Sequence, residues 1–125
     1  MEEEEIMQIA NTILSQLLAT TPRNVLFSWG ALQGFKAAQV DDMAGLKFRV
    51  NGRLFKGYVI IAYCWNDTYS IYLQDDNEVR LIREDVYFDE MTNVIDIAIE
   101  RGLNEAEYSA FCEAERQKLL HGDFS

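Results

Sequence analysis

The chain has 125 residues, of which 49% are hydrophobic and 26% are charged, with a single proline. Such a chain is typical of one globular domain that buries about two-thirds of its unfolded surface, which excludes small scaffolds held together by zinc or disulfides. No segment approaches the ~20 apolar residues that span a bilayer. The glutamates at positions 2–5 are the reverse of a basic signal peptide. We therefore expect one soluble, cytoplasmic domain over residues 1–125, with no membrane association.

Charge is distributed unevenly along the chain. The net charge is −10, which disfavours nucleic acid and anionic membranes as partners of the whole molecule. Residues 35–66 nevertheless hold five basic and two acidic residues, whereas residues 67–125 hold five basic and fifteen acidic ones. The basic middle is either a binding patch or a solvated strand face that protects a sheet edge against aggregation.

The first thirty residues predict a helix followed by a strand. Apolar residues recur at three- and four-residue steps from Ile6 to Leu17, which predicts an amphipathic helix over about residues 3–19. This helix is expected to end before Pro22, because the residue preceding a proline is pushed out of the α region. The apolar run at residues 25–29 indicates a first strand.

The next segment predicts a hairpin with one basic face. Residues 35–40 are a candidate strand, residues 41–45 a turn, and residues 46–51 alternate with the period of a half-buried strand. Asn51-Gly52 favours a two-residue type I′ hairpin, because these residue types tolerate the positive φ that both positions need. The hairpin therefore points its basic side chains to one face and its apolar side chains to the other.

The return strand of the hairpin, at about residues 53–65, is expected to be central in the sheet. It is apolar on both parities from Tyr58 to Trp65, so both of its faces should be covered. Gly57 indicates a bend or bulge before this part. Turns at 66–67 and 75–78 then lead to two further antiparallel strands.

The last third of the chain predicts helices. The apolar period becomes helical near Asp85 and continues to Gly102, which supplies a left-handed stop. Asn104 and Glu107 form a variant of the capping box that starts a final helix. The order of elements predicts an α+β fold, in which an N-terminal helix and two C-terminal helices pack on an antiparallel meander of four to five strands.

Catalytic and metal-binding patterns are weak in this sequence. His121 is the only histidine and lies close to the end of the chain, where a general base is poorly held. Glycine-rich phosphate loops are absent from the sequence. Cys64 and Cys112 lack the spacing of a redox pair or thiolate metal site and are interpreted as buried thiols. We predict that the protein is not an enzyme and has no catalytic residues, cofactor or metal.

Carboxylates leave one catalytic alternative open. The cluster at residues 75–78 lacks the spacing of a calcium loop and is interpreted as a turn. Glu84, Asp85, Asp89 and Glu90 crowd the predicted start of a helix, where the helix dipole favours acids. A carboxylate pair assembled by the fold would still permit a hydrolase or a divalent-metal site.

The candidate binding residues lie on the basic hairpin. They are Lys47, Arg49, Arg53 and Lys56, with Phe48, Phe55 and Tyr58 interleaved. Cations with aromatic side chains are typical of proteins that bind single-stranded nucleic acid. Strand alternation places Phe48 on the opposite face, which favours an acidic protein as the partner.

Five aromatic side chains allow a second interpretation. They either line a ligand cleft or stabilise the sheet by cross-strand packing, and packing is favoured. These residues are Trp29, Tyr63, Trp65, Tyr69 and Tyr72.

Five segments, taken in order, are similar to small uncharacterised proteins of bacteriophages and integrated mobile elements. The resemblance covers about residues 9–100 and departs from the group in the connection at 18–23 and in the final helix. It implies a phage or mobile-element setting, supports the α+β fold and transfers no catalytic residue. The segments are Ile13-Leu14-Ser15-Gln16-Leu17, Asn24-Val25-Leu26-Phe27-Ser28-Trp29-Gly30, Leu46-Lys47-Phe48-Arg49, Asp67-Thr68-Tyr69 and Glu84-Asp85-Val86-Tyr87-Phe88-Asp89-Glu90-Met91.

The leading hypothesis is a non-enzymatic protein that binds another macromolecule, with an unknown protein as its partner. Three alternatives stay open: a small-molecule or nucleic-acid binding module that uses the basic hairpin, an acidic mimic of DNA, and a carboxylate-dependent enzyme. A homodimer formed through an uncovered sheet edge or face also stays open.

Overall fold

The structure, a computed structural model, describes residues 2–31, 34–76 and 78–102. It has the predicted α+β fold, and the final helix predicted from Asn104 lies outside the described residues. In chain order the elements are α1 (Glu3–Thr20), α2 (Arg23–Trp29), β1 (Lys36–Val40), β2 (Met43–Asn51), β3 (Lys56–Tyr63), β4 (Tyr69–Gln74), β5 (Val79–Val86), α3 (Met91–Asp96) and the π-helix η1 (Ile97–Arg101).

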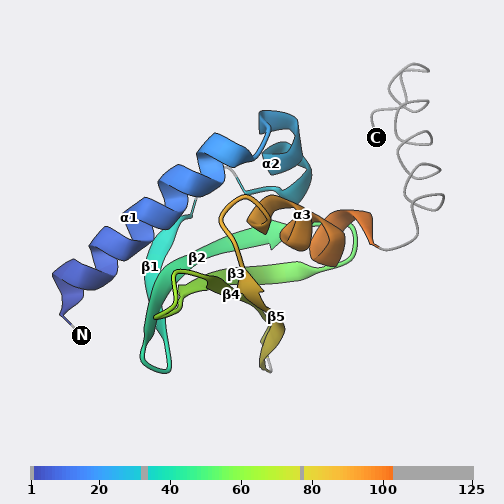
Figure 1. Ribbon diagram of the computed structural model, residues 1–125. Helices are drawn as coiled ribbons and strands as arrows, with labels where there is room; N and C mark the ends of the chain where they lie inside the picture. Colours follow the sequence, from blue (N-terminus) through green and yellow to red (C-terminus); the bar gives the residue numbers. More distant parts are fainter. Residues whose placement is uncertain (1, 32–33, 77, 103–125) are drawn as a thin grey trace, which may run out of the picture.

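The five strands form one antiparallel sheet in the order β1-β2-β3-β4-β5, which confirms the predicted meander. The helices α1, α2 and α3 lie on the same side of this sheet (Figure 1). The middle strand β3 is buried on both faces, because Val59 and Ile61 face the helices while Ile60 and Ala62 are buried on the other side. The predicted central position of this strand is confirmed.

The main core lies between the helices and the sheet. Apolar side chains at helical spacing on α1 and α3 meet every second residue of the inner strands. Among the described residues, no helix has the length and apolar character needed to cross a membrane. The largest side chains with almost no exposed surface are Trp29, Phe48, Ile13, Leu17, Leu46, Ile61, Ile71, Met91, Ile95 and Ile99.

The strand predicted at residues 25–29 is wrong, because this segment is helix α2. Pro22 precedes the first helical residue, and Gly30 ends the helix with a φ of 69°, in the left-handed region that suits a helix terminus. Leu26 and Trp29 are buried three residues apart, a spacing that fits a helix face. A mostly apolar segment of five residues is compatible with both a helix and a strand. The flanking Pro22 and Gly30 were therefore the more informative part of the sequence.

The two-residue hairpin predicted at Asn51-Gly52 is also wrong. Asn51 pairs with Lys56, so the loop has four residues and closes with Gly52 N–H donating to Phe55 O at 3.0 Å. Neither Asn51 nor Gly52 has a positive φ. The glycine is needed for space instead, because a Cβ at position 52 would lie 2.3 Å from the carbonyl oxygen of Ile99.

The tight two-residue turn lies between β1 and β2. Val40 pairs with Met43 across Asp41 and Asp42, and Asp41 has a φ of 53°. The predicted turn at 41–45 therefore extended too far, since β2 begins at Met43.

The predicted helix start near Asp85 is six residues too early. Glu84 and Asp85 belong to β5, and α3 begins at Met91 after a turn closed by Glu90 N–H donating to Tyr87 O at 2.9 Å. Phe88, which was assigned to the buried stripe, is 51% exposed. The helical segment ends at Gly102, as predicted, but with φ 74° and ψ −176° this glycine is not in the left-handed α conformation that was expected.

Candidate functional site

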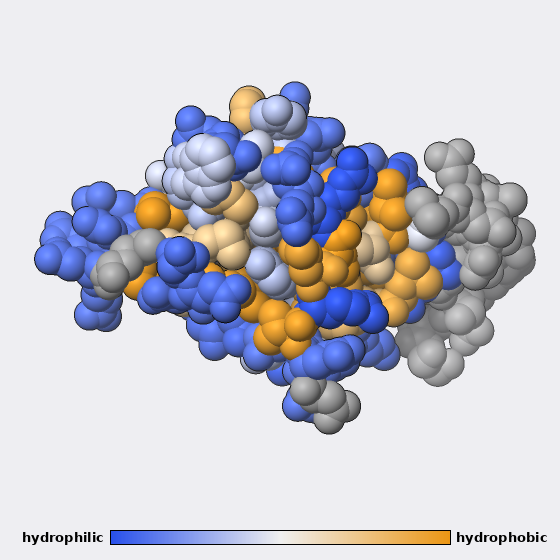
Figure 2. All heavy atoms as spheres, turned by 60° about the horizontal axis from the view of Figure 1, so that its bottom comes forward, coloured by the Kyte–Doolittle hydropathy of each residue, from blue (hydrophilic) through white to orange (hydrophobic). Residues whose placement is uncertain are grey.

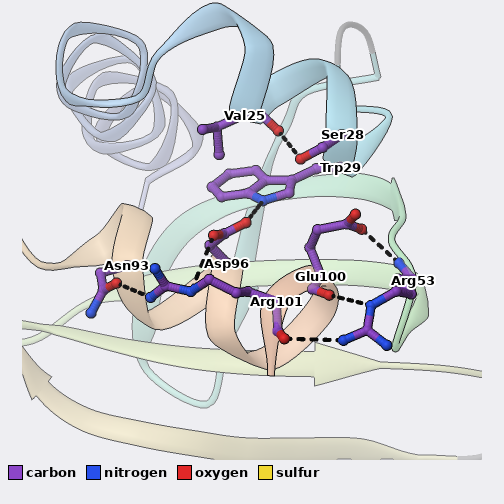
Figure 3. Close-up of polar contacts among 8 residues, drawn as sticks. All are labelled: Val25, Ser28, Trp29, Arg53, Asn93, Asp96, Glu100 and Arg101. Atoms are coloured by element: carbon purple, nitrogen blue, oxygen red, sulfur yellow. Dashed lines mark hydrogen bonds and ion pairs between the residues drawn. The ribbon is translucent and has the colours of Figure 1, made fainter. Parts of the chain in front are cut away.

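One of the predicted binding residues, Arg53, belongs to the fold. Its backbone N–H donates to Glu100 Oε2 at 2.7 Å, and its guanidinium donates to the carbonyl oxygens of Glu100 and Arg101, both at 3.0 Å (Figure 3). Leu54 N–H donates to Ile99 O at 2.7 Å. Carbonyl groups at a helix end have no partner within the helix. The loop between β2 and β3 therefore caps η1, and Arg53 is part of that cap.

A second set of polar contacts joins α2 to α3 and η1. The indole N–H of the fully buried Trp29 donates to Asp96 Oδ1 at 2.9 Å. Arg101 Nε lies 3.8 Å from Asp96 Oδ2, and its Nη2 donates to Asn93 Oδ1 at 2.6 Å (Figure 3). These contacts join three helical segments, which makes the cluster a structural one.

Glu100 makes stability depend on pH. Burial raises the pKa of its carboxyl above the usual 4.5, and the charge of Asp96 acts in the same direction, although the hydrogen bond from Arg53 N–H opposes it. An acid with a raised pKa binds its proton more tightly in the folded state, so stability falls as pH rises from about 4.5 through the folded pKa. We expect Glu100→Gln to be more stable than the wild type at pH 7, as measured by urea unfolding.

The difference between Glu100→Gln and the wild type is expected to shrink as pH falls toward 4.5, where the carboxyl becomes neutral. Glu78→Gln, which changes an exposed carboxylate in the β4–β5 turn, is the matched control and should leave the unfolding curve unchanged. A lower stability of Glu100→Gln at pH 7 would contradict this account of the buried carboxylate.

Three of the predicted binding residues share the open face of the sheet with a fourth cation. The basic strip is defined as Lys36, Lys47, Arg49 and Lys56. Register pairs Lys36 with Lys47, and Arg49 with Tyr58. The ammonium groups of Lys36 and Lys47 lie 5.5 and 4.5 Å from the centre of the Tyr58 ring. The structure thus brings Lys47, Arg49 and Lys56 together and separates Arg53 from them.

A cavity lies at the other end of the sheet. This acidic pocket has a volume of about 550 Å³. Figure 2, which views the face below the sheet of Figure 1, shows mostly hydrophilic side chains at the end where α1 begins and apolar ones toward the centre. The lining residues are Glu5, Ile9, Asp42, Met43, Tyr63, Cys64, Trp65, Asn66, Ser70, Tyr72, Glu84 and Asp85.

Two tight turns and an irregularity in β5 bring these lining residues together. The first turn of α1, the β1–β2 turn, the β3–β4 turn and the end of β5 all meet at this end. Asp41, Asp67 and Asp85 have φ values of 53°, 63° and 54°, and these are the positive values among the described non-glycine residues. Aspartate adopts this left-handed conformation more readily than most residues. Asp41 and Asp67 thus shape the two turns, and Asp85 both bends β5 and lines the pocket.

The pocket combines negative charge with aromatic surface. Among the described residues, its lining holds four carboxylates and no lysine, arginine or histidine. Burial raises the pKa of Tyr72, and the negative charges of Asp41 and Glu84 raise it further. Tyr63 donates a hydrogen bond from its hydroxyl to Asp67, which raises the pKa of this tyrosine.

The exposure of Trp65 corrects a prediction. Its side chain is 94% exposed, although the sequence placed it in a strand covered on both faces. Tyr63 packs edge-on against the buried Tyr69 across β3 and β4, and Tyr63, Trp65 and Tyr72 line the pocket. Trp29 does neither, because it is buried on helix α2.

Cys64 is half-buried in the pocket wall rather than in the core. Its Sγ lies 3.2 Å from Ser70 Oγ and 3.7 Å from Met43 Sδ. Within residues 2–31, 34–76 and 78–102, no group of three or more histidine, cysteine or acidic side chains is arranged to hold a metal ion. Cys112 and His121 lie outside these ranges.

Sequence analysis missed this pocket. The glutamates at residues 2–5 were interpreted as a solvated helix start, and Glu84 and Asp85 as part of another helix start. The sequence feature that could have indicated the pocket was Trp65, directly before the Asn66-Asp67 turn. A residue at that position lies beyond the paired part of the strand, so its side chain is not covered by the sheet. Comparisons of the chain with known protein families, curated proteins and solved structures found no match.

Proposed function

We propose that this protein is a non-enzymatic binding protein that recognises a partner protein by accepting an arginine or lysine side chain in the acidic pocket. The observation that carries the proposal is the lining of the pocket, in which four carboxylates surround aromatic side chains without a basic neighbour. The phage or mobile-element setting implied by the sequence resemblance is part of the proposal.

The charge and size of the pocket suit a cationic group. A volume of about 550 Å³ lies within the range of ligand sites in proteins. Carboxylates attract an ammonium or a guanidinium group, and aromatic faces contribute a cation–π interaction of about 0.5–1 kcal/mol at exposed sites. A planar guanidinium can stack on an indole and donate to a carboxylate at the same time, which favours arginine.

Trp65 supports a protein as the partner rather than a small metabolite. An indole with 94% of its surface exposed contributes little to the stability of the isolated chain. Tryptophan and arginine are enriched among the residues that dominate binding energy at protein interfaces. Trp65 lies at the rim of the acidic pocket, so a partner would cover the indole as its basic side chain enters.

The shape of the acidic surface favours this proposal over mimicry of DNA. A DNA mimic needs carboxylates spaced along a convex surface, as phosphates are on a duplex. Glu5, Asp42, Glu84 and Asp85 instead surround a concave pocket.

Titration with an arginine peptide tests the proposal. Acetylated and amidated Gly-Arg-Gly is added to ¹⁵N-labelled protein, and its citrulline analogue, which has the same shape without the charge, is the matched ligand control. We expect the indole N–H signal of Trp65 to shift with the arginine peptide alone, while the signal of the buried Trp29 stays in place.

Charge-neutralising variants locate the site. Asp42→Asn combined with Glu84→Gln is expected to weaken binding about tenfold, since two surface contacts of roughly 0.7 kcal/mol each are lost. Asp76→Asn combined with Glu78→Gln removes the same charge from the opposite end of β4 and should change the affinity less than twofold. Equal binding of the citrulline peptide, or equal weakening by both double variants, would refute the proposed site.

A further inference from the structure

The basic strip on the open face of the sheet is a second charged surface, and none of its four residues lines the acidic pocket. The basic strip crosses three adjacent strands, with Lys36 on β1, Lys47 and Arg49 on β2, and Lys56 on β3. Lys36 and Lys47 are direct cross-strand neighbours. Neighbouring strands lie about 4.8 Å apart, so the four cations occupy a width of roughly 10 Å.

The four cations form no direct ion pair within the described part of the chain. None of them forms an ion pair with residues 2–31, 34–76 or 78–102, although the whole chain holds 21 acidic residues. Like charges directly opposite each other on neighbouring strands are destabilising. The contacts of Lys36 and Lys47 with the Tyr58 ring offset part of this repulsion, but they do not neutralise the two positive charges. An anionic ligand would neutralise the strip.

We propose that the basic strip binds a short, extended acidic segment of a protein. Lys47 and Arg49 are two residues apart on one strand, and their side chains leave the same face about 7 Å apart. An extended peptide with acidic residues at alternate positions repeats its carboxylates at the same distance. Such a segment, lying along β2, pairs successive carboxylates with successive cations.

Two features favour a peptide over single-stranded nucleic acid. Nucleic-acid binding of this kind depends on aromatic rings that stack with bases. The ring of Tyr58 is already in contact with the ammonium groups of Lys36 and Lys47, so it is not free to stack with a base. Phe48 is fully buried on the other face of the sheet. Asp75 and Asp76 also line the groove of about 460 Å³ that adjoins Arg49 and Lys56. These acids oppose a long polyanion, whereas a short segment ends before it reaches them.

The test uses a peptide with alternating acids on the full chain. Acetylated and amidated Glu-Thr-Glu-Thr-Glu is titrated at low salt by calorimetry, beside the glutamine analogue and a thymidine pentanucleotide. We expect the glutamate peptide to bind, the glutamine analogue to show no binding, and the affinity to fall as salt rises. Absence of binding by the glutamate peptide, or tighter binding of the pentanucleotide, would overturn the proposal.

Matched variants separate the basic strip from general electrostatic attraction. Lys47→Gln with Arg49→Gln is expected to weaken peptide binding at least about fivefold. Arg80→Gln with Arg83→Gln removes two exposed cations from the far strand β5 and should alter the affinity less than twofold. Equal weakening by the two double variants would overturn the assignment to the strip. The acidic pocket takes no part in this experiment, so the outcome of the peptide titration is independent of the proposed function.

Discussion

Replacing Gly52 by alanine is expected to destabilise the protein by about 3 kcal/mol, because the added methyl group has no space. An ideal Cβ at this position lies 2.3 Å from Ile99 O and 2.9 Å from Ile99 C, which are backbone atoms of η1. The β2–β3 loop would have to move away from the helix and give up the hydrogen bond from Leu54 N–H to Ile99 O. Urea unfolding followed by far-ultraviolet circular dichroism measures the loss as a lower midpoint.

Gly34→Ala is the matched control for this substitution. Among the described residues, no atom beyond the chain neighbours lies within 4 Å of a Cβ at position 34, so the change carries only the strain of its φ of 85°. That strain is worth about 1 kcal/mol. If Gly52→Ala were no more destabilising than Gly34→Ala, close packing between the loop and η1 would not explain the glycine.

Trp29→Ala is expected to lower the free energy of unfolding by about 4 kcal/mol, because it leaves a large cavity in the core. The side chain has no exposed surface and bridges α2 to α3 through Asp96 Oδ1. Trp29→Phe keeps most of the packing and removes the N–H donor, which we expect to cost about 1–2 kcal/mol. Circular dichroism during urea unfolding is the suitable measurement, since fluorescence would change with the mutated residue itself.

The second tryptophan of the chain gives the control. Trp65 is 94% exposed, so Trp65→Ala should change stability by less than about 0.5 kcal/mol. The same variant should weaken binding of the arginine peptide. A stability loss in Trp65→Ala similar to that of Trp29→Ala would contradict the positions of the two side chains.

Long patterns in the sequence predicted the fold better than short ones. The stripe from Ile6 to Leu17 repeats over several turns, and the structure has α1 from Glu3 to Thr20. The alternation through β2 was also reliable, with Phe48 buried and Arg49 exposed. The prediction for residues 25–29 failed because a segment of five residues with four apolar ones fits a helix and a strand equally well. Helix α2 is instead fixed by burial of Trp29 and its hydrogen bond to the distant Asp96.

The sites were harder to predict, because their residues are distant in sequence. Glu5 and Glu84 line one pocket although 78 residues separate them. Three of the four predicted hairpin cations do share one face, since strand alternation is a local property. Arg53 departs from them because its loop caps η1, and that contact depends on a helix that follows 44 residues later, from Ile97.

The π-helix sets a limit on how this protein can change in length. Gly102 N–H donates to Ile97 O, five residues earlier, at 2.9 Å, so η1 holds one residue more than an α-helical turn would. Deleting one residue at the start of η1 would restore the α-helical repeat and rotate the side chains that follow within η1 by about 100°. Glu100 would then turn away from Arg53. A deletion between β4 and β5 would leave the contact of Glu100 with Arg53 in place, so natural variants that differ in length are expected there and not in η1.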